Sequence, residues 1–470
     1  MSEPHTVTPT NPATGEELPS FTRLTSDEVD AAIARSVEAF AALKSTTFVE
    51  RAAWMNRAAE ILESREDELV KLMATEMGKP VTAGHSEVEK CAWVCRYYAD
   101  NADSFLADET IETDDDQDSF IAYCPIGPVL AVMPWNFPLW QVFRFAAPAL
   151  MAGNTGLLKH ASNVQGCARA IQEIFDEAGF PASAFQNLAI DHDGAEQVIA
   201  DARVRAVTLT GSTAAGRKIA ETAGRNLKKT VLELGGSDPY VVLADADPVL
   251  AAKTCAQSRL INSGQSCIAA KRFIVVESVK DEFLETLVAE FRDQVLGDPL
   301  GEKTTIGPMA RTDLRDELAD QVQRSLDAGA TCLIGGHVPD EGELAKGAYY
   351  EPTILNEVVP GMPAFDEELF GPVAAVIAAK DEEEALELAN QSPFGLGGAV
   401  FTRDKERGER LARERIDCGG VAVNQFVASD PRLPFGGVKD SGYGRELSAF
   451  GIREFVNIKT ITSAQQTTAS

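Results

Sequence analysis

Apolar residues recur at helical spacing through the N-terminal part of the chain. Thr25 and Glu28 match the capping box that opens a helix. The apolar positions that continue this helix are Val29, Ile33, Phe40 and Leu43. Further helices are predicted over 49–77 and over 83–106. We interpret these helices as the wall of one domain.

Beyond an acidic linker at 114–116, short apolar runs alternate with helical patterns. Strands are predicted at 120–123, 129–132, 156–159, 185–190, 206–209 and 230–234, with helices at 165–178, 195–200 and 214–223. The pattern resumes after Gly235-Gly236, with strands at 240–243 and 272–276 and helices at 248–261 and 280–296. Such alternation predicts parallel sheets covered by helices. A last strand, 455–461, lies far along the chain from the others.

Acidic residues dominate the charge of this 470-residue chain, with 72 Asp and Glu against 43 Lys and Arg and a net charge of -29. We therefore expect neither nucleic acid nor an anionic membrane as a partner. The most apolar stretch, 127–153, holds several prolines and Arg144, which makes it a poor membrane span. The polar, proline-rich segment 1–19 lacks the apolar run of a signal peptide, so a cytoplasmic location is expected.

The eight cysteines are scattered and include no CxxC pair. This pattern favours reduced thiols in a cytoplasm over a disulfide framework. Cys91 and Cys95 are four residues apart on a predicted helix, but no histidine cluster accompanies them. We expect no metal site.

The stretch 262–267 places Cys267 after a short turn of small residues that contains Gly264. Most cysteines are small buried hydrophobes, and this remains one interpretation. The other is a nucleophile, which must ionise to a thiolate before it attacks a carbonyl. A Cys/His hydrolase is disfavoured, because the five histidines have no partnering context.

Three further positions follow predicted strands. Gly211 and Ser212 open a helix, where backbone amides favour phosphate, although glycine-rich turns are common without a ligand. Glu233 ends a buried strand and suits a general base with a raised pKa, or else an ion-paired strand end. The Asn136 amide suits an oxyanion donor, although most asparagines in turns are structural.

Together these motifs resemble the aldehyde dehydrogenase superfamily, from about Asn11 to Ile461. The motifs, in order, are Pro134–Pro138, Glu233–Gly236, Gly264–Cys267, Glu368–Pro372, Pro434–Gly437 and Gly442–Glu446. Within the superfamily the chain is most similar to the succinate-semialdehyde dehydrogenases of the bacterial Sad-type branch. The segments that carry this finer resemblance are Lys159–Ala161, Glu233–Pro239 and Ala428–Asp430.

The resemblance implies an α/β fold with two doubly wound domains and a small β element for oligomerisation. The Rossmann-like cofactor domain would comprise 1–114 and 135–235, and the catalytic domain 236–450. The oligomerisation element would comprise 115–134 and 451–470. Its C-terminal strand would pair with the sheet of a neighbouring subunit, in a homodimer or homotetramer.

The resemblance also implies a mechanism. Cys267 attacks an aldehyde, and the Asn136 amide and the Cys267 backbone N–H hold the resulting oxyanion. Oxidation leaves a thioester, which water activated by Glu233 hydrolyses, and Glu446 assists proton transfer. The alternatives left open are other aliphatic aldehydes, glutarate semialdehyde, a CoA-acylating enzyme and a non-catalytic homologue.

The implied cofactor is NAD or NADP. Its implied ligands are Trp135, Lys159, Ser162, Gly211, Ser212, Leu234, Glu368 and Phe370. Relatives that prefer NAD carry a glutamate at the position of Ser162, where it repels a 2′-phosphate. Serine therefore leaves NADP acceptable.

For the substrate carboxylate, the resemblance points to Arg144, eight residues after Asn136. Ile261 occupies the position of the second arginine in animal relatives, so Ser429 or Arg432 would stand in for it. Ala269 replaces the second cysteine of those enzymes, which excludes a local disulfide switch.

Overall fold

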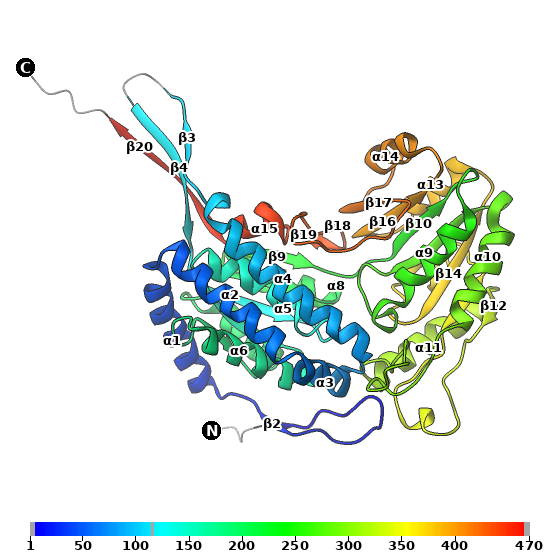
Figure 1. The fold of residues 1–470 in the computed structure, drawn as a ribbon, viewed down its shortest axis with the longest axis horizontal. Coiled ribbons are helices and arrows are strands. Elements are labelled where there is room, and N and C mark those ends of the chain that lie inside the picture. The colour runs from blue at the N-terminus through cyan, green and yellow to red at the C-terminus, as the bar shows by residue number, and fades with distance from the viewer. Residues whose placement is uncertain (1–4, 114–116, 465–470) are drawn as a thin grey trace, which may run out of the picture.

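The computed structural model describes residues 5–113 and 117–464. Two α/β bodies lie side by side, and a β arm projects away from both (Figure 1). The predicted acidic linker at 114–116 lies outside the described residues. No helix among the described residues is long and apolar enough to cross a membrane.

Four helices precede the first large sheet. They are α1 (Ser26–Lys44), α2 (Phe48–Ser64), α3 (Glu66–Met77) and α4 (Val81–Phe105). The capping box of Thr25 and Glu28 at the start of α1 is confirmed. The single helical region predicted over 49–77 is two helices, because Arg65 between them leaves the helical conformation (φ -103, ψ 15). Its side chain forms ion pairs with Glu68 and Glu173 at this junction.

The first large sheet has six strands in the order β19-β9-β8-β5-β6-β7. Its strands are β5 (Pro128–Met133), β6 (Thr155–His160), β7 (Phe185–Asn187), β8 (Ala206–Thr210), β9 (Lys229–Glu233) and β19 (Gly442–Tyr443). The helices of this segment are α5 (Trp140–Met151), α6 (Gln165–Ala178), α7 (His192–Ala200) and α8 (Thr213–Arg225). All its strand pairs are parallel except β19 with β9.

The second large sheet has seven strands in the order β12-β13-β14-β11-β10-β16-β17. Its strands are β10 (Asp238–Val242), β11 (Ala270–Val276), β12 (Thr331–Ile334), β13 (Thr353–Asn356), β14 (Val373–Ala379), β16 (Gly397–Phe401) and β17 (Gly420–Val423). Its helices are α9 (Pro248–Leu260), α10 (Glu277–Arg292), α11 (Thr312–Asp327), α13 (Glu382–Asn390) and α14 (Lys405–Glu414). The predicted α/β class with two helix-covered sheets is confirmed.

The projecting arm is an antiparallel sheet in the order β20-β4-β3, formed by β3 (Glu109–Ile111), β4 (Gln117–Pro125) and β20 (Val456–Ala464). The sequence grouped 129–132 with this element, and the structure corrects that assignment. Those residues belong to β5, whose buried apolar run suits the interior of the parallel sheet. The isolated C-terminal strand finds its partner within its own chain, pairing with β4 along its whole length.

Opposite ends of the two large sheets meet. In the six-stranded sheet, β5, β6, β8 and β9 are parallel, so their carboxyl ends share one edge. Only residues 234–237 separate the end of β9 from the start of β10. The carboxyl edge of the first sheet therefore lies against the amino ends of the second, and the residues singled out in the sequence gather there.

Candidate active site

Cys267 follows a turn of unusual backbone geometry. Asn262 and Ser263 both adopt left-handed conformations, with φ of 54° and 55°, and Gly264 follows with φ of 77°. Such angles are costly for residues other than glycine and persist only where the surroundings fix them. A Cβ on Gly264 would collide with the carbonyl of Gly371, so only glycine fits this position.

Hydrogen bonds from several segments hold this turn in place. The Ser263 hydroxyl accepts from the Gly307 N–H at 2.9 Å, and Gln265 Oε1 accepts from the Ala310 N–H at 2.9 Å. The Asn262 amide donates to the carbonyl of Asn136 at 2.7 Å. The backbone turn that leads to Cys267 is thus held by contacts with the rest of the protein.

Cys267 lines a cavity of about 810 Å³. Aromatic and aliphatic side chains form much of its wall, and Lys90, Arg144 and Ser429 line it as well. The apolar members of the wall include Phe137, Trp140, Leu260, Ile268, Phe426 and Phe435. The cavity can therefore take a small aliphatic molecule that carries an anionic group.

Burial raises the pKa of the Cys267 thiol to about 11, although the charges of Arg144 and Lys271 pull it down. Glu368 and Glu233 push it further up. At neutral pH the thiol is protonated in this environment, and the two cations are the groups that favour its ionisation.

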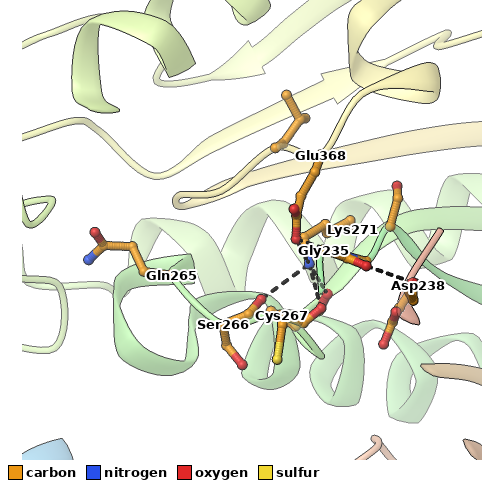
Figure 2. A network of polar contacts seen from close by, with 12 residues as sticks. Gly235, Asp238, Gln265, Ser266, Cys267, Lys271 and Glu368 are labelled. Carbon is orange, nitrogen blue, oxygen red and sulfur yellow. Dashed lines mark hydrogen bonds and ion pairs between the residues drawn. The ribbon is translucent and has the colours of Figure 1, made fainter. Parts of the chain in front are cut away.

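Lys271 is buried beside Ser266 and Cys267 (Figure 2). Its ammonium donates to the carbonyls of Cys267 at 2.8 Å and Ser266 at 3.1 Å, and lies 3.5 Å from Glu368 Oε1. The sulfur of Cys267 points away from the ammonium, while its carbonyl oxygen points toward it (Figure 2). Lys271 therefore joins the backbone of Cys267 to the Glu368 carboxylate.

Replacement of Lys271 by methionine should slow the reaction of Cys267 with iodoacetamide. Loss of the ammonium removes a charge that favours the thiolate, and one pKa unit changes the thiolate fraction about tenfold. We expect alkylation at neutral pH to slow by about that factor, measured by mass spectrometry of the Cys267 peptide. The exposed Lys303→Met serves as the control, and equal rates in both variants would contradict the effect.

Asn136 lies directly beside the nucleophile turn. Its Nδ2 donates to the carbonyl of Gln265 at 3.1 Å, while its Oδ1 has no hydrogen-bond partner within the described residues. His160 supports the same loop, because its Nε2 contacts the Pro138 carbonyl at 2.9 Å and its Nδ1 accepts from the Ala161 N–H at 3.0 Å. Burial lowers the pKa of His160 to about 4, so the ring is neutral.

A buried ion pair supports the start of α5, just after this loop. The Glu87 carboxylate accepts from the N–H groups of Leu139 at 2.8 Å and Trp140 at 2.9 Å, and it also pairs with Lys79. The Lys79 ammonium lies 3.9 Å from the centroid of the Phe137 ring. This pair, which was missed in the sequence, fixes the direction in which α5 leaves the Asn136 loop.

Glu233 is only 2% exposed, and neither of its carboxylate oxygens has a hydrogen-bond partner among the described residues. Burial and the neighbouring Glu446 raise its pKa well above the usual range. Glu446 pairs in turn with Arg144, whose Nη2 also donates to the Thr210 hydroxyl at 3.2 Å. Glu233 is thus a desolvated carboxyl group with the raised pKa that a general base requires.

The carboxyl edge of the six-stranded sheet suits a dinucleotide. Ser212 caps α8, and its hydroxyl accepts from the Ala215 N–H at 3.3 Å. A Cβ on Gly216 would clash with Leu234, so glycine permits close packing of α8 on the strand end. The exposed start of this long helix and the half-buried Lys159 at the end of β6 present N–H groups and a cation, a combination that suits phosphate and ribose groups.

Two more predicted residues reach this edge from the second sheet. Glu368 accepts from the Gly236 N–H at 3.0 Å. Phe370 packs edge-on against Trp135, with ring centroids 5.8 Å apart and planes at 88°. The segment 368–372 thereby contacts both Gly236, between the two sheets, and the loop that holds Trp135.

A protein-family model described as the aldehyde dehydrogenase family matches residues 1–461. The chain belongs to the aldehyde dehydrogenase family. This confirms the family resemblance inferred from the motifs.

The chain is similar to several succinate-semialdehyde dehydrogenases over nearly its whole length. A probable succinate-semialdehyde dehydrogenase (NADP(+)) of Synechocystis sp. is 51% identical over 451 residues, covering 96% of this chain and 98% of the relative. The succinate semialdehyde dehydrogenase (NAD(P)+) Sad of Escherichia coli K12 is 47% identical and covers 96% of each chain. The crystal structure of succinic semialdehyde dehydrogenase from Streptococcus pyogenes with NADP+ has a TM-score of 0.94 at 39% identity, covering 98% of this chain and 100% of that one.

The substrate-side residues predicted for this aldehyde dehydrogenase lie in two different places. Arg144 and Ser429 line the cavity with Cys267. Arg432 is absent from the cavity wall, because its largely exposed guanidinium pairs with Asp430 and stacks 5.4 Å from the Trp93 ring centroid. The structure brings a different cation to the cavity, Lys90 of α4.

The sequence pattern partly indicated that Lys90 lies near the buried face of its helix. It lies three residues after the buried Glu87 and next to the buried Cys91, near the face of α4 that packs inward. All eight cysteines of this aldehyde dehydrogenase are free. Among residues 5–113 and 117–464, no group of three or more His, Cys, Asp or Glu side chains is placed to hold a metal ion.

Proposed function

We propose that this aldehyde dehydrogenase oxidises succinate semialdehyde to succinate with NAD or NADP. The observation that carries the proposal is the single cavity that combines the Cys267 thiol with apolar walls and basic side chains. An ω-carboxylated aldehyde matches each of these features. The succinate-semialdehyde dehydrogenases at 51% and 47% identity support the same substrate.

In the proposed reaction the Cys267 thiolate attacks the aldehyde carbon and forms a thiohemiacetal. The Asn136 amide, which now bonds to the Gln265 carbonyl, turns to the developing oxyanion together with the Cys267 N–H. A nicotinamide held beside Trp135 and Phe370 would supply the hydride acceptor that oxidation of the thiohemiacetal to a thioester requires.

Glu233 completes the cycle as the general base. Its desolvated carboxylate takes a proton from water as the water attacks the thioester, and the acid is released from Cys267. Glu446, beside Glu233 and paired with Arg144, accepts or relays that proton. This base distinguishes the proposed hydrolysis from transfer of the acyl group to CoA.

A panel of aldehyde substrates tests the proposed function directly. kcat/KM is measured for aliphatic aldehydes of increasing length, with and without a terminal carboxylate, using each cofactor. A preference for succinate semialdehyde over glutarate semialdehyde and over uncharged aldehydes supports the proposal. Equal kcat/KM values across the panel reject it.

For the cofactor we propose that Lys159 and Glu368 bind the riboses and that Gly211 and Ser212 bind the pyrophosphate. Leu234 would line the same site, with Trp135 and Phe370 beside the nicotinamide. The exposed Ser162 follows β6 and leaves room for a 2′-phosphate.

Replacement of Ser162 by glutamate should shift the cofactor preference toward NAD. A carboxylate at this position repels the 2′-phosphate of NADP and accepts from the 2′-hydroxyl of NAD. We expect kcat/KM for NADP to fall by about tenfold or more, while the value for NAD is retained. Ser162→Gln, which adds similar bulk without charge, is the control, and the same loss in both variants would mean that steric bulk is responsible.

We further propose that the six-stranded unit is the cofactor domain and the seven-stranded unit the catalytic domain. The β arm would be the oligomerisation element of a cytoplasmic homodimer or homotetramer. The outer edge of β20 has no partner strand within the described residues and is available to a neighbouring subunit. Light scattering of the purified protein tests the assembly.

A further inference from the structure

Lys90 is a largely buried basic side chain of the cavity that has no carboxylate partner within the described residues. Its Nζ donates to Ser429 Oγ at 2.7 Å and lies 4.5 Å from the centroid of the Trp140 ring. In the part of the chain that the structure describes, Lys90 takes part in no ion pair. A hydroxyl and an aromatic face are neutral, so neither of them neutralises the charge of the ammonium.

The other buried charges near it are already compensated. Arg144 pairs with Glu446, and Glu87 pairs with Lys79 while it accepts two backbone N–H groups. Lys253 also lines the cavity but is exposed to solvent, where water compensates its charge. Among these buried charges, the Lys90 ammonium is therefore the one without an opposite charge in direct contact in the described part of the chain.

The surroundings of Lys90 disfavour its charged form. Burial and the nearby Arg144 lower the pKa of Lys90 to about 8. Glu87 and Cys91 on its own helix and Asp430 on the facing loop oppose this shift without cancelling it. An anion bound inside the cavity would stabilise the charged form of Lys90 against both burial and the charge of Arg144.

We propose that Lys90 is the specificity-determining cation of this enzyme and that, with the Ser429 hydroxyl, it binds the terminal carboxylate of the aldehyde substrate. The inference rests on the proposed function and deepens it. Arg144 then acts mainly on Glu446, next to the general base, and Arg432 has no part in substrate binding. The Trp140 ring beside the ammonium excludes water from the contact and strengthens it.

Two variants of Lys90 separate charge from shape. Lys90→Met keeps the length of the side chain and removes the charge, whereas Lys90→Arg keeps the charge. We expect Lys90→Met to raise KM for succinate semialdehyde roughly 10- to 100-fold, as expected for loss of a charge-assisted hydrogen bond. KM for butanal, which has the same chain without the carboxylate, should stay within about twofold of wild type. Lys90→Arg should recover most of the affinity for succinate semialdehyde.

The pH profile gives a second readout that a purely structural role would not move. In the wild-type enzyme the ratio of KM for succinate semialdehyde to KM for butanal should rise above about pH 8, as Lys90 loses its proton. Arginine remains charged in this range, so the ratio in Lys90→Arg should stay flat. Titration of Cys267 or Glu233 affects both substrates and cancels in the ratio.

Binding without turnover completes the test. Succinate should protect the wild-type enzyme and the surface control Lys71→Met against thermal unfolding, and it should protect Lys90→Met much less. A wild-type enzyme without preference for the carboxylated aldehyde overturns the proposed substrate and this inference together. A wild-type preference that survives in Lys90→Met overturns this inference alone.

Discussion

The Cys267→Ala variant should lose aldehyde oxidation by on the order of 10⁴-fold or more, because Cys267 is the only thiol among the described residues that line the cavity. Its fold should be unaffected, since the turn is held by Ser263, Gln265 and Asn262 and not by the thiol. Activity is measured from NAD(P)H formation with succinate semialdehyde, and cofactor affinity from the quenching of tryptophan fluorescence.

Cys332→Ala is the matched control, because Cys332 is also a half-buried free thiol but lies on β12, outside the cavity. We expect it to retain full activity. If Cys267→Ala keeps substantial activity while Cys332→Ala loses it, the assignment of the nucleophile is wrong.

The Glu233→Gln variant should stop after the first half of the reaction. Steady-state turnover should fall about 10²- to 10⁴-fold, the usual contribution of a general base. Rapid mixing should still show a burst of about one NAD(P)H per active site, because thioester formation does not require this carboxylate. Mass spectrometry should find the acyl group on Cys267. A variant without a burst would show that Glu233 acts before the thioester forms.

The pH dependence of turnover tests whether Glu446 raises the pKa of Glu233. Glu233 works only as the carboxylate, and burial together with Glu446 raises its pKa, so kcat should fall on the acid side of that raised value. Glu446→Gln removes a negative charge and frees Arg144 to face Glu233. Both changes favour the carboxylate, so the acid limb should move to lower pH. A limb that moves upward or does not move would exclude the coupling.

Local signals in the sequence predicted much of the fold. The Thr25–Glu28 box starts α1, and the bounds predicted for 165–178 match α6. The pairing of strands was harder to predict. β4 and β5 follow each other across a short turn, yet they belong to different sheets. The continuous apolar run of β5, typical of a central parallel strand, could have distinguished them, but 129–132 was instead grouped with the arm.

Part of the candidate site could be proposed from the positions of strand ends. Lys159 and Glu233 lie at the carboxyl ends of parallel strands and Gly211 follows another, which is where ligands usually bind in such sheets. Cys267 and Glu368 instead precede β11 and β14, so the rule about carboxyl ends would not have found them. Only the family motifs did so.

Lys90 and Lys271 could not be assigned from sequence for a physical reason. A lysine on an amphipathic helix or at the start of a strand usually reaches solvent. Here the Ser429 loop, which lies 339 residues away, covers Lys90, and the carbonyls of the nucleophile turn take up the Lys271 ammonium. Their roles arise from contacts between distant segments, which spacing along the chain does not encode.

The outer edge of β20, which is unpaired within the described residues, makes solubility depend on subunit assembly. A nine-residue strand with an open row of backbone N–H and C=O groups, and with Ile458 exposed, can template the addition of foreign strands. Subunit pairing at this edge would therefore protect the chain from aggregation as well as build the oligomer. Conditions that weaken the assembly should produce fibrous or amorphous aggregates at protein concentrations where each subunit is still fully folded.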